Sequence, residues 1–167
     1  MPFTQILGQA TAVETLTRAL THDLVHHAYR FEGSAGVGKE MTALAFAQAL
    51  VCGEAQLGCG RCDACRRAIT FSSEPPVVPL HPDVILIGKG LYPEEVIGKR
   101  ETNEISVEQI RRLVLARSAY APHEGRARVF IVRNADKLSI GAANALLKTL
   151  EEPVPQTHFV LLTAQSE

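Results

Sequence analysis

The sequence is poor in aromatic residues and nearly free of net charge. Its 167 residues include no tryptophan, three tyrosines and six phenylalanines, and the formal net charge is −1. A chain with this balance exerts no overall attraction on nucleic acid, so contact with DNA would need a local cluster of arginine and lysine. No aromatic stacking platform accompanies the arginines, which argues against binding of single strands by stacking. These arginines, for which a solvated helix face is the simpler interpretation, are Arg111, Arg112, Arg117, Arg126 and Arg128.

Long apolar runs and a secretion signal are also lacking. No uninterrupted apolar segment approaches the length that spans a bilayer, roughly 18 residues. The first five residues lack a basic flank followed by an apolar core, which argues against a signal peptide. Cysteine is scarce, and all four cysteines lie between Cys52 and Cys65. A secreted disulfide framework usually spreads its cysteines through a smaller chain, so we expect a cytoplasmic protein with a bound metal.

Apolar segments alternate with amphipathic ones along the chain, which is long enough for one domain over residues 1–167. The predicted helices cover residues 9–22, 38–51, 63–71, 106–119 and a segment from Ser139 to just before Pro153. The predicted strands cover residues 28–32, 84–87, 129–132 and 159–163. Uniformly apolar strands that alternate with helices indicate an α/β fold, a parallel sheet with helices on both faces.

Three details of this pattern can be checked against a structure. Residues 106–109 match a capping box that opens a helix. The last helix is expected to turn Ala143, Leu146, Leu147 and Leu150 towards the core. Residues 88–104 are polar, charged and rich in glycine, and they are expected to form a long surface loop that is a candidate for disorder.

A glycine-rich phosphate-binding loop follows the first predicted strand. Its residues are Gly33, Ser34, Ala35, Gly36, Val37, Gly38, Lys39 and Glu40, which complete the pattern G-x-x-x-x-G-K. Backbone N–H groups and Lys39 of such a loop cradle a phosphate chain, and the next residue is normally a Ser or Thr that holds magnesium. Glu40 removes that hydroxyl and adds negative charge. The loop is therefore predicted to bind nucleotide and to be poorly equipped to cleave it, while a glycine-rich turn without a ligand is the alternative.

The strand expected to carry a second catalytic group lacks it as well. A phosphate-loop ATPase needs a buried strand that ends in an acid, which organises magnesium and water. The strand over residues 129–132 is the best candidate by position, but Arg133 and Asn134 follow it. Asp136 comes two or three positions late and is interpreted as a surface or cap residue. Position 40 thus lacks the hydroxyl, and positions 133–134 lack the acid, that ATP cleavage requires. The sequence therefore predicts that the chain does not hydrolyse ATP.

The four cysteines have the spacing C-x6-C-x2-C-x2-C. Cys52, Cys59, Cys62 and Cys65 would satisfy tetrahedral zinc, and a closed site of four thiolates has a structural role because it leaves no open position for chemistry. Gly58 and Gly60 permit the tight backbone that such chelation needs. The zinc module is expected to extend over about residues 52–72. An iron–sulfur cluster and free structural cysteines are the remaining interpretations.

Several segments together resemble the bacterial DNA polymerase III clamp-loader family. They are His26-His27-Ala28-Tyr29, the four-cysteine insertion, Tyr120-Ala121-Pro122, and the long motif from Ala145 to Pro153, Ala-Leu-Leu-Lys-Thr-Leu-Glu-Glu-Pro. The resemblance covers nearly the whole chain and implies an AAA+ fold. The zinc insertion narrows it to the motor subunits (tau/gamma) and their paralogue, the delta-prime subunit.

The residues at the two lost positions favour the delta-prime type. Motor subunits carry Thr or Ser after the loop lysine and Asp-Glu at the strand end, whereas this chain has Glu40 and Arg133-Asn134. The resemblance implies a stationary subunit without ATPase activity of its own, within a DNA polymerase holoenzyme. It implies structural zinc, ATP or ADP with magnesium in doubt, and a hetero-pentamer with motor and delta subunits that loads the sliding clamp onto primer-template DNA.

The resemblance implies three further things. Thr163 matches the family's sensor position, although a threonine at the edge of a core is the simpler interpretation. An arginine-finger motif is expected beyond Glu167, and the lid and collar domains are expected to lie outside this chain.

Two other functions stay open. The chain could be an active tau/gamma-like ATPase in which Glu40 or Asp136 holds magnesium. A nucleotide kinase with a zinc-bound lid also joins a phosphate loop to four cysteines, but the Ala145–Pro153 motif and the missing acids argue against it.

Overall fold

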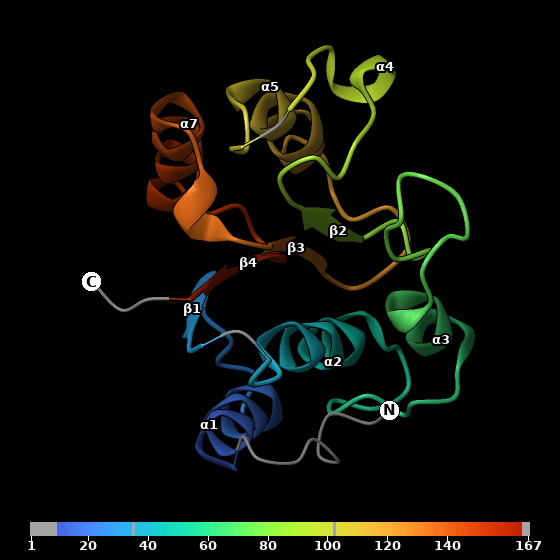
Figure 1. Cartoon of the computed structure of the whole chain (residues 1–167). Coiled ribbons are helices and arrows are strands. Elements are labelled where there is room, and N and C mark those ends of the chain that lie inside the picture. The colour runs from blue at the N-terminus through green and yellow to red at the C-terminus, as the bar shows by residue number, and fades with distance from the viewer. Residues whose placement is uncertain (1–9, 35, 102, 165–167) are drawn as a thin grey trace.

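The computed structural model describes residues 10–34, 36–101 and 103–164. These residues form a four-stranded sheet between two helical layers (Figure 1). The strands are β1 (Ala28–Glu32), β2 (Val84–Ile87), β3 (Arg128–Val132) and β4 (Thr157–Thr163). Their order is β1-β4-β3-β2, and every neighbouring pair is parallel. The carboxyl ends of all four strands therefore lie at one edge of the sheet, where a parallel α/β fold places its functional groups.

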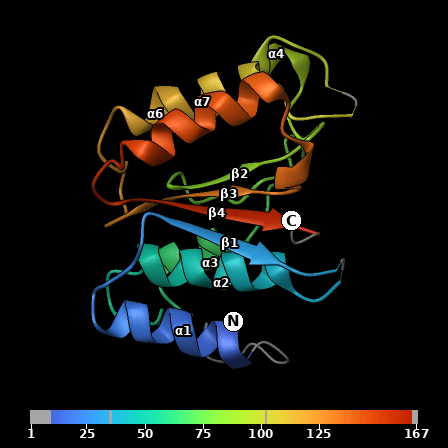
Figure 2. The same ribbon diagram turned by 90° about the vertical axis from the view of Figure 1, so that its left-hand side faces the viewer.

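Helices cover both faces of this sheet, as Figure 2 shows. One layer consists of α1 (Ala10–Thr21), α2 (Lys39–Val51) and α3 (Asp63–Ile69). The other contains α4 (Glu94–Ile97), α5 (Val107–Gln109), the π-helical η2 (Ile110–Leu115), α6 (Ala116–Ser118) and α7 (Ile140–Glu151), and a short 3-10 turn, η3 (Ala135–Lys137), precedes α7. The predicted α/β class is confirmed. Among the described residues, no helix has the length and apolar character needed to cross a membrane.

The two faces of the sheet support separate apolar cores because side chains alternate along each strand. Ile131 contributes to the core beneath α1 and α2, together with Phe46 and Leu86. Its neighbour Phe130 contributes to the core beneath α5, η2 and α7, where it stacks on Phe159 with ring centroids 5.0 Å apart. The whole of β2 and residues 129–132 of β3 are apolar because both faces of these strands are covered.

The expectation of a plain surface loop over residues 88–104 is wrong in part. The segment contains α4, and Ile97 is completely buried. The Glu101 carboxylate accepts hydrogen bonds from the backbone N–H of Ser106 at 2.7 Å and from Gln109 Nε2 at 2.7 Å. Tyr92 also packs against the core, and its hydroxyl donates to the carbonyl of Leu86 at 2.6 Å. The charge and glycine content that suggested a plain loop therefore hid these anchoring contacts.

The capping box at the start of α5 forms only on one side. The Ser106 hydroxyl accepts from the backbone N–H of Gln109 at 3.3 Å, as predicted. The Gln109 side chain does not accept the backbone N–H of Ser106, as a full capping box requires, because that N–H donates to the Glu101 carboxylate. Instead Gln109 donates to the carbonyl of Gly88 and accepts from its N–H, both at 2.9 Å. The helix start is thereby tied to the carboxyl end of β2.

The inner face of α7 differs from the prediction. Leu146 is buried and Leu150 is half-buried, but Ala143 is exposed and Leu147 is 52% exposed. Ala142 takes the inward position instead. Leu147 lies on the same side of the helix as Asn144, Lys148 and Glu151, because residues three and four positions apart share a face. The prediction followed the apolar residues alone and overlooked this polar face.

Candidate functional site

The glycine-rich loop joins β1 to α2 at the carboxyl edge of the sheet. Gly33 donates its N–H to the carbonyl of Thr163 at 3.2 Å, which holds the start of the loop beside the end of β4. Gly36 and Gly38 have φ values of 85° and 90°, a left-handed backbone that favours glycine. Gly38 is the N-cap residue of α2. Ala35, also part of the predicted site, lies outside the described residues.

Lys39 and the first turn of α2 give this loop its positive character. Lys39 is the first residue of α2, and its ammonium group donates to the backbone carbonyls of Gly33 and Ser34. The N-terminus of a helix carries partial positive charge from N–H groups that lack intrahelical partners. The loop thus combines a lysine with a helix N-terminus, which is the arrangement that attracts phosphate.

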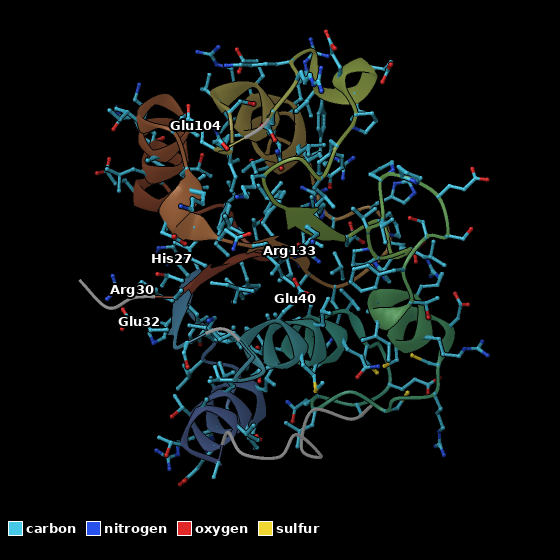
Figure 3. All side chains as sticks on the ribbon, in the orientation of Figure 1. His27, Arg30, Glu32, Glu40, Glu104 and Arg133 are labelled. Atoms are coloured by element: carbon cyan, nitrogen blue, oxygen red, sulfur yellow. The ribbon has the colours of Figure 1, made fainter. Side chains whose placement is uncertain are left out.

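Glu40 and Arg133, predicted separately as lost catalytic positions, are brought together in the structure. Arg133 Nε donates to Glu40 Oε1 at 2.5 Å, and Arg133 NH2 donates to Glu40 Oε2 at 3.2 Å. The two side chains are 35% and 37% exposed, respectively. Figure 3 shows them between β3 and the start of α2. Sequence reasoning missed the pair, although the opposite charges at two positions that normally serve one magnesium ion were a usable signal.

The backbone around Arg133 positions its side chain for this contact. Arg133 continues the β ladder, because its N–H donates to the carbonyl of Ile87 at 2.7 Å. Gly88 lies beside the arginine, since a Cβ added there would be in ordinary van der Waals contact with Arg133 Cβ at 3.5 Å and Arg133 Cδ at 3.6 Å. Asp136, the other acid considered, is exposed in η3. The strand end therefore presents a guanidinium, not a carboxylate, to the phosphate loop.

The four cysteines form one compact cluster. Their sulfur atoms all lie within 4.8 Å of one another, and the Sγ–Sγ distances Cys52–Cys62 and Cys59–Cys65 are both 3.9 Å. Tetrahedral zinc with Zn–S bonds of roughly 2.3 Å would place its ligands about 3.8 Å apart. The cluster could therefore hold a metal such as zinc.

Local backbone structure brings these sulfurs together. Cys52 follows the last residue of α2, Cys62 caps α3, and Cys65 lies within α3. Gly58 and Gly60 adopt φ values of 82° and 75° in the turn between them. A Cβ at Gly58 would lie only 3.3 Å from the Cα of Ala49, so this glycine allows the turn to pack closely against α2.

Backbone N–H groups point at the sulfurs and favour the thiolate form. Cys52 Sγ accepts from the N–H groups of Glu54 and Cys59, both at 3.4 Å. Burial raises the pKa of the Cys52 thiol, but these hydrogen bonds outweigh it and bring the pKa to about 6. Burial of Cys65, together with the neighbouring cysteines, raises its pKa. Metal ligation requires deprotonated cysteine, and the hydrogen bonds from Glu54 and Cys59 favour that form at Cys52.

Comparison with known proteins places the chain in a family. A family model described as DNA polymerase III, delta subunit, matches residues 8–167. The chain belongs to this family of DNA polymerase III clamp-loader subunits.

Curated relatives carry the names of other DNA polymerase III subunits. The chain is 33% identical over 167 residues to DNA polymerase III subunit tau of Escherichia coli, an alignment that covers 99% of this chain and 23% of that protein. It is 33% identical over 165 residues to subunit tau of Bacillus subtilis, with 98% and 26% covered. The chain thus spans about a quarter of the length of these relatives. A gamma subunit-related protein from Thermotoga maritima shares the fold, with a TM-score of 0.57 and 20% identity over 90% of this chain and 38% of that one.

Proposed function

We propose that this chain is the AAA+ domain of a non-hydrolysing, delta-prime-type subunit of the DNA polymerase III clamp loader. In that role it helps load the sliding clamp onto primed DNA during replication. The observation that carries the proposal is the ion pair between Glu40 and Arg133. These residues stand at the magnesium-ligand position and at the end of the strand that should supply the second acid.

The chemistry of ATP cleavage explains why this pair matters. Phosphoryl transfer depends on a magnesium ion held by a hydroxyl and an acid, and on a residue that orients the attacking water. Here the carboxylate is bound to a guanidinium, and the guanidinium takes the place of the acid. The pair supports a site that retains a phosphate cradle and lacks the groups that activate water.

Two cofactor assignments belong to the proposal. Cys52, Cys59, Cys62 and Cys65 hold a structural zinc ion within a module of about residues 52–72. The loop of residues 33–40 holds the phosphates of ATP or ADP without cleaving them. The partners are the tau/gamma motor subunits and a delta subunit in a hetero-pentamer, and primer-template DNA is reached through that assembly.

Steady-state ATP hydrolysis by the reconstituted clamp loader tests the proposal. Lys39→Ala in this chain should leave turnover by the complex unchanged within about twofold, because Lys39 serves no hydrolytic centre. The matched control is alanine at the loop lysine of a motor subunit, which should abolish that subunit's turnover. A comparable loss from Lys39→Ala here would contradict the proposal.

The names of the relatives favour a second candidate, an active tau/gamma-like motor subunit. Relatives named tau or gamma are 30–33% identical over nearly the whole chain. In that case the Glu40 carboxylate would break its ion pair with Arg133 and bind magnesium. The isolated chain would then hydrolyse ATP in a magnesium-dependent way. Turnover by the chain alone that disappears with Lys39→Ala would establish this candidate.

A further inference from the structure

Arg133 follows the last residue of β3, and its guanidinium contacts Glu40, the last residue of the phosphate loop. We propose that Arg133 determines the ligand specificity of this site, making it select polyphosphates that carry no magnesium, and that Glu40 competes with the ligand for Arg133. The inference rests on the proposed function, since it assumes that the loop of residues 33–40 binds phosphate.

The geometry places Arg133 within reach of a ligand in the loop. Its guanidinium binds Glu40, the second residue of α2, and the adjacent Lys39 donates to the loop carbonyls. The loop thus receives one cation, Lys39, from α2 itself, and a second cation from the end of β3 contacts the residue next to Lys39 in the chain. A phosphate chain bound against the first turn of α2 would lie beside Lys39 and near the guanidinium.

The charge at this position decides between free and magnesium-bound ligands. Magnesium shields the same phosphate oxygens that a guanidinium would bind, and it needs oxygen ligands from the protein to hold it there. A guanidinium binds phosphate oxygens directly through two parallel hydrogen bonds and repels a divalent cation. Arg133 would thus provide the counter-charge that magnesium provides in an ATPase, and magnesium would weaken binding.

Glu40 weakens the attraction of Arg133 for phosphate but still allows phosphate to bind. Its carboxylate occupies the guanidinium through two hydrogen bonds, and a phosphate chain must displace it or share the arginine with it. Both side chains are about one-third exposed, so water can solvate each partner when the pair opens. Removal of the Glu40 charge should therefore strengthen phosphate binding, whereas removal of the Arg133 charge should weaken it.

A second Arg–Glu pair near the loop provides a matched control. Arg30 and Glu32 form an ion pair on β1, an edge strand, and Glu32 immediately precedes Gly33. Figure 3 shows this pair at the edge of the sheet, apart from Arg133. Glu32→Gln removes the same charge at the residue that immediately precedes the loop, without releasing Arg133. This variant shows how much the loss of one negative charge near the loop changes phosphate binding when Arg133 stays paired with Glu40.

Isothermal titration calorimetry of the zinc-loaded full chain tests the inference, with pyrophosphate and ADP as ligands. The buffers are depleted of magnesium by resin, not by a chelator, so that zinc stays bound, and each titration is repeated with magnesium. Without magnesium, Glu40→Gln should tighten binding about tenfold and Arg133→Gln should weaken it about tenfold, as expected for a charge-assisted bidentate contact. Magnesium should weaken binding by the wild-type chain, and Glu32→Gln should change affinity less than about twofold.

Three results would overturn the inference. In the first, Glu40→Gln binds the ligands no more tightly than Glu32→Gln does. In the second, magnesium strengthens binding by the wild-type chain. In the third, neither the wild-type chain nor any variant binds pyrophosphate or ADP. Thermal unfolding of each variant shows that it is folded. The proposed function fails on a different measurement, magnesium-dependent ATP turnover by this chain, so the two failures are distinguishable.

Discussion

Gln48 donates from Nε2 to the backbone carbonyl of Cys65 at 3.0 Å, and both residues are completely buried. This bond joins α2, the helix that begins at the phosphate loop, to α3, the helix that carries the last cysteine. Cys52 also follows directly on the last residue of α2. The cysteine cluster therefore adjoins the C-terminal end of α2. A change in the structure of the cluster should affect this helix, whose first residues are Lys39 and Glu40.

Removal of the zinc ion that we propose for the cysteine cluster should destabilise the chain. Without it, residues 52–72 have little apolar core to hold four sulfurs within 4.8 Å, and a structural zinc site contributes its binding free energy to folding. We expect native mass spectrometry to find one zinc ion, and Cys65→Ser to lose it with a loss of unfolding free energy of at least about 3 kcal/mol.

A matched control is Ser72→Ala, which changes a serine at the end of the same module without touching a cysteine. It should keep the zinc ion. Equal stability of the zinc-loaded and zinc-free chains would contradict a structural role for the metal.

Local sequence patterns predicted the strands and the cysteine cluster because their causes are local. Residues 129–132 are uniformly apolar since both faces of β3 are covered, and the cysteine spacing by itself limits how the sulfurs can meet. The Glu40–Arg133 pair joins residues 93 positions apart. It depends on the order of the strands, which the sequence does not state. Leu147 was misplaced because the prediction overlooked the polar face formed by Asn144 and Lys148 on the same helix. Ile97 was overlooked because it lies within a polar segment.

Glu101 is expected to hold the 88–105 segment in place. Its carboxylate accepts from the N–H groups of Gly90 at 3.1 Å and Ser106 at 2.7 Å and from Gln109 Nε2 at 2.7 Å. Glu101→Ala leaves these donors without their acceptor, which should lower the free energy of unfolding by about 2 kcal/mol. Hydrogen exchange should accelerate in this segment more than in the strands.

The control for this experiment is Glu104→Ala. Glu104 is exposed in the same segment, so its removal should change stability by less than about 0.5 kcal/mol. If both variants behaved alike, the Glu101 network would not be what anchors the segment.

Adjacent leucines on α7 allow a direct test of how this helix faces the core. Leu146 is 3% exposed and packs with Phe130 and Phe159, whereas Leu147 is 52% exposed. Leu146→Ala should cost about 3 kcal/mol of unfolding free energy, the usual effect of a cavity in a packed core. Leu147→Ala should cost less than about 0.5 kcal/mol. Urea denaturation of both variants measures the difference, and equal costs would mean that α7 is rotated relative to the structure.

Asp83 connects the start of β2 to the turn before β3. It is completely buried, and its carboxylate accepts from three successive backbone N–H groups, those of His123 at 2.6 Å, Glu124 at 2.8 Å and Gly125 at 2.6 Å. Asp83→Asn places an amide N–H against donors, so it should lower the free energy of unfolding by about 2 kcal/mol at pH 7. Asp136→Asn makes the same chemical change at an exposed site and should have almost no effect.

The effect of Asp83 on stability should depend on pH in a defined direction. Burial raises the pKa of this carboxyl, but the three N–H groups and the nearby His81 outweigh it, and the pKa is lowered. Because the folded state binds this proton more weakly than the unfolded state, the carboxylate stabilises the fold above the ordinary aspartate pKa, about 3.9. That contribution disappears as pH falls through the lowered pKa of the folded state. In urea denaturation at several pH values, the gap between the wild type and Asp83→Asn should therefore be constant from pH 7 to about pH 5 and shrink below about pH 4. A gap that stayed constant down to pH 3 would show that the ionised carboxylate is not the stabilising form.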